Sequence, residues 1–460
     1  MKAIRNETKV EAFTERLIRT MTEGTLPPGS RLRSVRDAAE YEKLGVNTVV
    51  EAYSRLVARG YVESRPGSGY YVRKSSSHRQ APAAHVTAAM DVVSLLREQL
   101  EQHYEVRVGD GRPPASWMEG SEMGAHLRRV RSESFTHIDH GYGTPWGYAP
   151  LRDTVVRLLG ERTIHVHARQ VLLTQGANHA LDLIVRRLLE PGDKALVDSP
   201  GYYPLFGKLK LAKVEMLGVP RMDDGPDLDV LRGHLERHRP KVFFTQSLAH
   251  NPTGTTISLP KAHKLLQLAA EFDCLVVEDD PFADLFPATA PRLAALDQLE
   301  RVIYVSSFSK TLSAGLRVGY IAGSAARIQD LCDLKMLTVV STSDFVERAV
   351  HQLIIAGHYR RHLNRVRTRL TGMHRPAVTA LARTGVVVHP ADPSGYYIWV
   401  QLPASVDELA LVRDAGAKGI FLAPGSIFYP NRKSDYPAMR VNVAYATDSR
   451  FLRFLSKVSD

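Results

Sequence analysis

A lysine in a serine-rich turn is the clearest sign of chemistry in this sequence. The apolar run 302–305 predicts a buried strand, after which Ser307 and Ser309 precede Lys310, and Arg317 follows seven residues later. A lysine amine in a pocket that favours its neutral form can make a Schiff base with an aldehyde. Hydroxyls and a guanidinium are good donors to a phosphate dianion. The stretch therefore has the groups that a pyridoxal phosphate (PLP) site needs, although taken alone it is more often a solvated lysine.

Further apolar runs with β-branched residues alternate with helical patterns, such as 181–188 and 265–272. This alternation predicts an α/β fold with a mainly parallel sheet that is covered on both faces. In such sheets the functional residues lie where the strands end. The predicted strands are 171–174, 195–198, 242–245, 275–279 and 302–305.

The residues that follow these strands suit the same cofactor. Gly176 and Ala177 open a helix whose backbone N–H groups could approach a phosphate, and Tyr202 could lie on a planar ring, although loop aromatics more often serve packing. Asn251 stands in a rigid His-Asn-Pro-Thr-Gly turn and offers an amide. Asp279 ends a buried strand, where a carboxylate is costly without a cation. That cation would be a pyridinium nitrogen or, in the alternative interpretation, an arginine.

Together these motifs resemble the fold-type I, aminotransferase-like PLP proteins from about Pro113 to the C-terminus. By this resemblance Lys310 carries the internal aldimine, and Asp279 holds the pyridine nitrogen protonated, which makes the ring an electron sink. The matching residues are Tyr142-Gly-Thr-Pro-Trp-Gly147, Pro191-Gly-Asp193, Asn251-Pro-Thr-Gly254, Glu278-Asp-Asp280, Ser307-Phe-Ser-Lys310, Arg317-x-Gly319, Ala423-Pro-Gly-Ser-x-Phe428 and Arg440.

The resemblance implies roles for the remaining residues. Asn251 donates to the ring hydroxyl, Tyr202 stacks on the ring, and Tyr142 reaches the phosphate of the partner subunit. Arg440 holds the α-carboxylate of an amino acid by a bidentate pair. The phosphate ligands are Gly176, Ala177, Ser307 and Arg317, with the Ser309 hydroxyl beside them.

One departure from the family pattern concerns the chemistry. Three residues past Asp279 these proteins commonly have a tyrosine, whose phenol donates to the ring oxygen and lowers the pKa of the aldimine. This chain has Phe282 there, after Pro281. We therefore expect PLP to bind through the other contacts, with an altered aldimine pKa and weaker catalytic competence.

The N-terminal part, residues 1–74, has a different pattern. Apolar residues from Val10 to Met21 share one helical face, a short helix follows from about Val35, and a third helix ends at Gly60. Two β-rich runs then flank the turn 65–69, which is a hairpin signal. Three short helices and a hairpin predict a winged helix-turn-helix, whose third helix enters the major groove of DNA.

This part resembles the DNA-binding domain of the GntR family through Pro28-Gly-Ser-Arg-Leu32, Asn47-Thr-Val-x-x-Ala-Tyr53 and Arg65-Pro-Gly-Ser-Gly69. Arg33 replaces a usual proline, and Gly45-Val46 replaces a usual Ser-Arg or Ser-Lys, so a usual DNA contact is missing. In the alternative interpretation Arg36 and Asn47 only cap helices. The predicted DNA contacts are Arg33, Ser34, Arg36, Asn47, Thr48, Arg65, Gly67 and Ser68.

Charge and composition agree with these assignments. The chain of 460 residues carries a net charge of +11, of which residues 1–74 hold +5, and this density favours a polyanion partner at the N-terminus. Only two cysteines occur, which suits a reducing cytoplasm, and no apolar run predicts a membrane span. The predicted organisation is a DNA-binding domain at 1–74, a polar linker at 75–90, and a PLP-binding and dimerisation domain at 91–460.

A GntR-like winged helix ahead of an aminotransferase-like domain is the layout of the MocR/GabR regulators. The resemblance implies a domain-swapped homodimer that binds a double-stranded DNA operator and responds to PLP or to its aldimine with an amino acid or amine. The alternative is a working aminotransferase with an accessory DNA-binding domain, since Lys310, Asp279 and Arg440 are all present. In a third interpretation the PLP-like domain serves only as a dimerisation scaffold. The identity of the effector and the operator sequence do not follow from the sequence.

Overall fold

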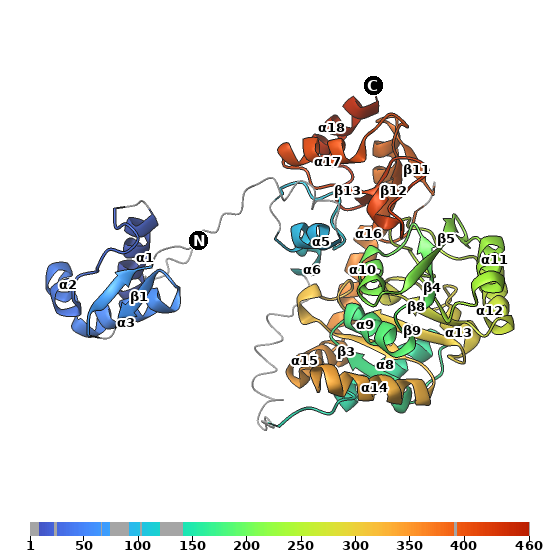
Figure 1. Cartoon of the computed structure of the whole chain (residues 1–460), viewed down its shortest axis with the longest axis horizontal. Coiled ribbons are helices and arrows are strands. Elements are labelled where there is room, and N and C mark those ends of the chain that lie inside the picture. The colour runs from blue at the N-terminus through green and yellow to red at the C-terminus, as the bar shows by residue number, and fades with distance from the viewer. Residues whose placement is uncertain are drawn as a thin grey trace. The chain divides into compact units, whose positions relative to one another are not determined.

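The computed structural model describes residues 9–22, 25–65, 67–73, 92–101, 104–119, 141–390 and 393–459 (Figure 1). The chain divides into two compact units, Met1–Val86 and Thr87–Asp460. The predicted linker at 75–90 lies outside the described residues. Along the rest of the chain that the structure describes, no helix is both long and apolar enough to cross a bilayer.

The first unit is the winged helix-turn-helix that the sequence predicts. Its elements are α1 (Lys9–Thr22), α2 (Val35–Glu42), α3 (Val46–Ala58), β1 (Val62–Arg65) and β2 (Gly69–Val72). The two strands pair antiparallel, with Arg65 opposite Gly69. The helices and the wing bury one shared apolar core, made of Phe13, Leu32, Ala38, Ala39, Val49, Ala52, Tyr53, Leu56, Val62 and Val72.

The bounds of the second helix and the start of the third are set by the residues that flank them. Ser34 caps α2 by accepting a hydrogen bond from the Asp37 amide at 3.2 Å. Lys43 ends that helix in the left-handed region, at φ 54°. Gly45 precedes α3 without a side-chain cap, so the backbone N–H groups at the start of α3 receive no side-chain bond from that residue.

The second unit is built on a mainly parallel sheet. Among the described residues its order is β3-β10-β9-β8-β7-β4-β5-β6. The five strands β9, β8, β7, β4 and β5 run parallel, while β10 is antiparallel to both of its neighbours and β6 to β5. The strands are β3 (Val171–Thr174), β4 (Lys194–Ser199), β5 (Glu215–Met222), β6 (Gly225–Pro226), β7 (Val242–Thr245), β8 (Leu275–Asp279), β9 (Val302–Ser307) and β10 (Gly319–Ala322).

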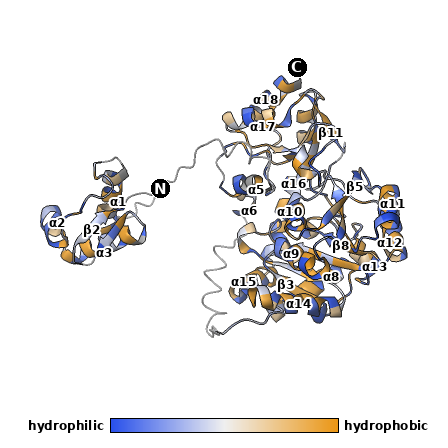
Figure 2. Cartoon of the chain, viewed as in Figure 1, coloured by the Kyte–Doolittle hydropathy of each residue, from blue (hydrophilic) through white to orange (hydrophobic). Residues whose placement is uncertain are grey.

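Helices cover both faces of this sheet, as the sequence predicts. Successive residues of β9 point to opposite faces, so Tyr304 belongs to one apolar core and Val305 to the other. Figure 2 shows the helices of this unit with blue and orange alternating along them, as expected of elements with one polar and one apolar side. They are α8 (Ala149–Glu161), α9 (Ala177–Leu188), α10 (Tyr203–Leu211), α11 (Leu228–His238), α12 (Leu259–Glu271), α13 (Leu293–Asp297), α14 (Ala325–Val339) and α15 (Asp344–Ile355).

The C-terminal part adds a smaller antiparallel sheet after the long helix α16 (His358–Ala382). Its strand order is β11-β12-β14-β13. In Figure 1 this sheet lies with α17 and α18 at one end of the unit. The elements are β11 (Val387–His389), β12 (Tyr397–Gln401), α17 (Glu408–Ala417), β13 (Ala423–Pro424), β14 (Ala438–Asn442) and α18 (Ser449–Ser459).

Residues 106–112, called the lead-in segment below, join this small sheet from far away in the sequence. The segment comes between the helices α5 (Val92–Glu101) and α6 (Ala115–Met118). The backbone N–H of Gly109 donates to the Phe421 carbonyl at 2.8 Å, and the backbone N–H of Asn442 donates to the Val108 carbonyl at 2.6 Å. A Cβ on Gly109 would lie 2.5 Å from the Ala423 nitrogen, so only glycine fits this close approach.

Candidate cofactor site and DNA-contact surface

Lys310 comes directly after β9, in the turn where the sequence places it. Its Nζ donates to the carbonyl of Gly111 at 2.5 Å. Burial lowers the pKa of Lys310 to about 8; the Asp110 carboxylate opposes this shift, and the Arg440 guanidinium adds to it. A larger fraction of the amine is therefore neutral near pH 7 than in a solvated lysine, which suits attack on an aldehyde.

Asp279 ends β8 and is buried with one oxygen unpartnered. Its Oδ2 accepts from Gln246 Nε2 at 2.7 Å, while Oδ1 has no hydrogen-bond partner among the described residues. Burial raises the pKa of Asp279 to about 7, and the Gln246 bond opposes that shift. The arginine of the alternative interpretation pairs with the next carboxylate instead, because Arg292 Nε lies 2.9 Å from Asp280 Oδ2. A pyridinium N–H is a donor of the kind that Oδ1 lacks.

The predicted phosphate residues lie around one strand end. Gly319 at the start of β10 pairs with Thr174 on one side and with Ser307 on the other, which brings the two phosphate turns together. Gly176 has φ 76°, and a Cβ there would lie 2.8 Å from Nη2 of Arg317.

The hydrogen-bond donors around this strand end fit a phosphate. Ala177 is the first residue of α9, so the backbone N–H groups and the positive end of the helix dipole point toward the predicted phosphate position. The Ser309 hydroxyl is buried and has no partner in the described part of the chain. Arg317 makes a hydrogen bond to the Gln175 carbonyl at 2.9 Å, which fixes its guanidinium beside Gly176. These residues and Asp279 together fit the two ends of PLP.

Arg440 lies in β14 and is almost fully buried. Its Nη1 donates to Asn251 Oδ1 at 2.9 Å, and its Nη2 donates to the Gly109 carbonyl at 2.8 Å. Its Nε has no partner among the described residues. Since the Asn251 oxygen is used by Arg440, the Asn251 amide nitrogen faces its surroundings as a donor. The guanidinium carbon also lies 4.6 Å from the centre of the Tyr397 ring.

The aromatic residues divide into a buried and an exposed set. Tyr202 precedes α10 and lines the same small cavity as Asp279. Phe282 is buried against the rings of Tyr396 and Tyr397, with centroids 5.6 and 5.7 Å away. Tyr142, in contrast, is 86% exposed, so it makes little contact with the site of its own chain.

Sequence reasoning missed the lead-in segment, although it contacts both functional cations. The carbonyls of Gly109 and Gly111 accept from Arg440 and Lys310, and the Tyr397 hydroxyl also donates to Gly111, at 3.0 Å. The pattern Gly-Asp-Gly at 109–111 was the available signal, because glycines allow a backbone to approach closely. The acceptors are main-chain atoms, so no side-chain type marked them.

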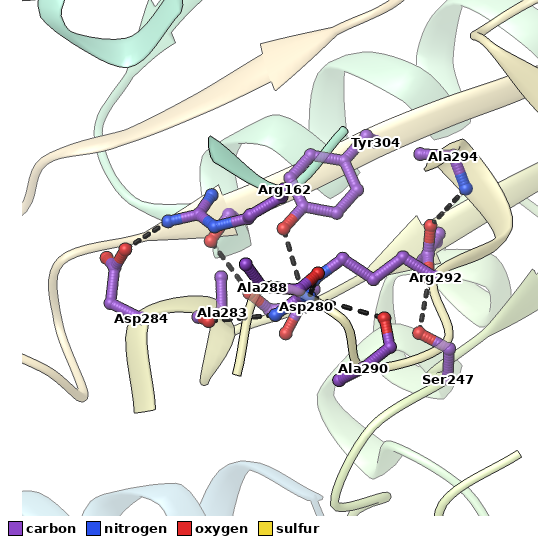
Figure 3. A network of polar contacts seen from close by, with 12 residues as sticks. Arg162, Ser247, Asp280, Ala283, Asp284, Ala288, Ala290, Arg292, Ala294 and Tyr304 are labelled. Carbon is purple, nitrogen blue, oxygen red and sulfur yellow. Dashed lines mark hydrogen bonds and ion pairs between the residues drawn. The ribbon is translucent and has the colours of Figure 1, made fainter. Parts of the chain in front are cut away.

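A buried polar network behind Asp279 was also missed. Figure 3 shows Arg292 and Tyr304 pointing at Asp280, with Arg162 and Asp284 beside them. Tyr304 donates to Asp280 at 2.8 Å, and Arg292 also reaches the Ala283 carbonyl at 2.9 Å.

The same network continues to the lysine turn. Arg162 pairs with Asp284, whose carboxylate also accepts from Tyr359. The Tyr359 hydroxyl lies 2.8 Å from the hydroxyl of Thr311, the residue after Lys310. The turn that carries Asp279 and the turn that carries Lys310 are thus fixed to one buried set of charges.

The predicted DNA contacts are mostly exposed on the first unit. Arg33, Arg36 and Asn47 are exposed, and Thr48 is half-buried. Arg33 stacks on the Tyr41 ring at 3.8 Å, which leaves its guanidinium edge free for a phosphate. Ser34 and Gly45, not Arg36 and Asn47, precede the two helices, so the capping interpretation of Arg36 and Asn47 is wrong.

The wing residues are held by local contacts. Arg65 bonds Glu63 at 2.6 Å and stacks on the Tyr71 ring, while the Ser68 and Tyr71 hydroxyls lie 2.8 Å apart. Gly67 has φ 72°, the left-handed backbone that glycine tolerates in a tight turn.

Both units match known protein families. Residues 120–458 match the aminotransferase class I and II family, and residues 9–72 match the bacterial regulatory proteins of the gntR family. An uncharacterized HTH-type transcriptional regulator of Escherichia coli (strain K12), YdcR, is 29% identical over 434 residues, which is 91% of this chain and 92% of that protein. The 2-aminoadipate transaminase of Thermus thermophilus is 32% identical over 340 residues, covering 72% of this chain and 82% of that enzyme.

A solved structure resembles the larger unit closely. The α-aminoadipate aminotransferase LysN of Thermus thermophilus, complexed with N-(5'-phosphopyridoxyl)-L-leucine, aligns with a TM-score of 0.73 and 28% identity. The alignment covers 81% of this chain and 96% of that one.

Fold and site therefore define a fold-type I PLP protein with a DNA-binding domain at its N-terminus. The chain belongs to the aminotransferase class I and II family, and a gntR-family winged helix precedes that domain, which is the layout of the MocR-like regulators. Its cofactor is pyridoxal 5'-phosphate, and its N-terminal domain binds DNA.

Proposed function

We propose that this protein is a transcription regulator whose affinity for its operator responds to PLP and to an amino compound held at Arg440. The observation that carries the proposal is the double use of the lead-in segment. Two of its carbonyls, at Gly109 and Gly111, hold the two cations that the ligands need. The segment follows the linker predicted at 75–90, with helix α5 (Val92–Glu101) between the two. A change at the site can thus pass along the chain through α5 and the linker to the DNA-binding domain.

The residues assigned to the cofactor each have a defined task. When bound, PLP supplies an electron-withdrawing ring and an aldehyde that amines attack. Lys310 would attach it, and Asp279 Oδ1 would accept from its ring nitrogen. Asn251 Nδ2 would donate to its ring oxygen, and Tyr202 would pack on the ring. Gly176, Ala177, Ser307, Ser309 and Arg317 would hold its phosphate.

Arg440 is the proposed anchor of the effector. A carboxylate that binds end-on to the two terminal nitrogens of the guanidinium would compete there with the Asn251 oxygen and the Gly109 carbonyl. Because a ligand shifts an equilibrium only through different affinities for two states, this competition is a source of the required difference. The effector is therefore an amino compound with a carboxylate.

The active assembly is proposed to be a homodimer in which each DNA-binding domain reaches over its partner. Tyr142 supports this assembly, because a residue meant for a phosphate is 86% exposed on its own chain. An exposed phenol of this kind can complete the phosphate site of a second subunit. The cytoplasmic location predicted from the sequence stays a prediction.

The second candidate function is an active aminotransferase with an accessory DNA-binding domain. The favouring observation is that Lys310, Asp279 and Arg440 all lie at the site, in a chain similar to a 2-aminoadipate transaminase. Phe282 argues against efficient turnover, because it brings no hydroxyl to the ring. The scaffold interpretation predicts a colourless protein, and the unpartnered Asp279 and Ser309 atoms oppose it.

The test uses the full-length protein and a DNA duplex selected by it from a random pool. We expect fluorescence anisotropy to show an affinity change of roughly tenfold on adding PLP with one of the twenty amino acids, the size of an ordinary coupling energy. Arg440→Lys should abolish the amino acid response, whereas Arg232→Lys, an exposed surface change, should leave it intact. Steady keto acid release from many amino acids, with DNA affinity unchanged, would overturn the regulator and establish the enzyme.

A further inference from the structure

The first half of α3 presents apolar methyl groups to the outside. Val46 and Val50 lie one helical turn apart and are 50% and 41% exposed. The side of α3 that faces the core is occupied by other residues, Val49, Ala52, Tyr53 and Leu56. The two valines are therefore not needed for the fold of the unit, and their exposure has a cost in water.

The charges around this face favour DNA as its partner. The first half of α3 contains no Lys or Arg, and the first cation of the helix, Arg55, pairs with Glu51 at 2.6 Å. Exposed cations stand instead on the preceding elements, at Arg33, Arg36 and Lys43. This division gives phosphate-binding cations at the side and, at the centre, apolar groups next to a Glu51 that is paired with Arg55, an arrangement that suits a helix in a major groove.

We propose that Val46 and Val50 read the C5-methyl groups of thymines, and that exposed Asn47 between them reads an adjacent adenine. Thymine is the only base with a methyl group in the major groove, and asparagine makes a bidentate pair with adenine N6 and N7. The preferred half-site under α3 is thus rich in A·T pairs. The inference requires DNA binding but not the response to PLP, so it can be tested separately from the proposed regulation by PLP.

The test removes single methyl groups from the DNA. The full-length protein first selects a duplex from a random pool, and each thymine in it is then replaced by deoxyuridine. Since a buried methyl contributes roughly 0.8 kcal/mol, we expect about fourfold weaker binding at each of one or two positions. Replacement at thymines outside the α3 footprint is the control on the DNA.

Valine-to-alanine variants identify which valine contacts which thymine methyl group. In Val46→Ala or Val50→Ala, deoxyuridine at the matching position should no longer weaken binding, because the contact is already lost. Val57→Ala is the control on the protein, since Val57 is 37% exposed on the same helix but in its last turns. It should keep the full deoxyuridine effect.

Two results would overturn the inference. One is a wild-type protein that binds thymine and deoxyuridine duplexes equally at every position, or that selects no DNA. The other is a deoxyuridine effect that stays unchanged in both valine variants.

A further test introduces a new base preference. Val46→Arg should bind a duplex with guanine at that position roughly tenfold more tightly than the duplex with thymine, because arginine pairs with guanine O6 and N7. A loss of PLP response with the deoxyuridine effect intact would count only against the proposed function.

Discussion

The two units present their functional residues in opposite ways. In the PLP domain most of the proposed site side chains are buried or half-buried and already bonded, apart from the exposed Tyr142 and Arg317, and single atoms such as Asp279 Oδ1, Ser309 Oγ and Arg440 Nε stay unpartnered. In the DNA-binding domain they are exposed and carry few contacts. A buried site thus indicates its ligand through the polar atoms that it leaves unpartnered. An exposed surface indicates its ligand through the residue types that it displays, and through those that it lacks.

The largest expected effect is that of Lys310→Ala, which should affect the PLP domain and leave the DNA-binding domain unchanged. Lys310→Ala should abolish attachment of PLP, because it removes the amine that the aldehyde needs. The DNA-binding domain should keep its fold, since the described residues of its apolar core all lie between Phe13 and Val72. Absorption spectra before and after borohydride reduction measure attachment, and calorimetry follows the small unit. Reducible yellow colour in this variant would contradict the assignment.

The second prediction compares a buried with an exposed ion pair. Asp280→Asn leaves Arg292 without its anion in a fully buried site, which should cost about 3–5 kcal/mol of the stability of the PLP domain. Glu15→Gln breaks the exposed pair with Arg59 in the DNA-binding domain and should cost about 0–1 kcal/mol. Urea unfolding of each variant measures both. Equal losses would remove the contrast between the units.

The third prediction concerns pH. Because the folded pKa of Lys310 is about 8, the rate of PLP attachment should rise about tenfold per pH unit below pH 8 and level off above it. The unfolded chain keeps that proton to a higher pH, so Lys310 should also make the domain more stable as the pH rises above 8. Uptake rates from pH 6 to 10 test the first point. A rate that still climbs at pH 10 would mean an ordinary, solvated lysine.

The smallest effect concerns a cap. Ser34→Ala removes the hydrogen bond to the Asp37 amide and should cost about 1 kcal/mol, or roughly 4–8 °C in the melting temperature of the small unit. Ser54→Ala, at an exposed position inside α3, is the matched control and should change stability little. If Ser34 contacts DNA as well, affinity will fall more than the loss of folded protein explains.

Much of the fold was predictable because its signals are local. The runs 242–245 and 275–279 coincide with β7 and β8, and the run 302–305 is β9 without its last two residues. The positions of Lys310 and Asp279 after β9 and at the end of β8 could be predicted because strand ends are readable from apolar runs and Gly or Ser turns. The winged helix was also predicted correctly, since its helices have clear apolar faces.

Other parts could not be predicted, because they depend on distant pairs. Gly109 meets Arg440, and Arg162 meets Asp284, across intervals that no periodicity reports. Asp280 could not be distinguished from Asp279 by type, and only the fold decides which carboxylate faces Arg292. For Arg36 and Asn47 the sequence left capping open, and the backbone at Ser34 and Gly45 settled it.

The lead-in segment has a consequence for the logic of the signal. Lys310, the proposed cofactor residue, holds the Gly111 carbonyl, and Arg440, the proposed effector residue, holds the Gly109 carbonyl two positions earlier. Under the proposed function each ligand alone acts on one of these bonds, while the backbone hydrogen bonds of Val108 and Gly109 keep the segment on the small sheet. The two inputs therefore act on one segment, and we expect the response to both together to exceed the response to either one alone.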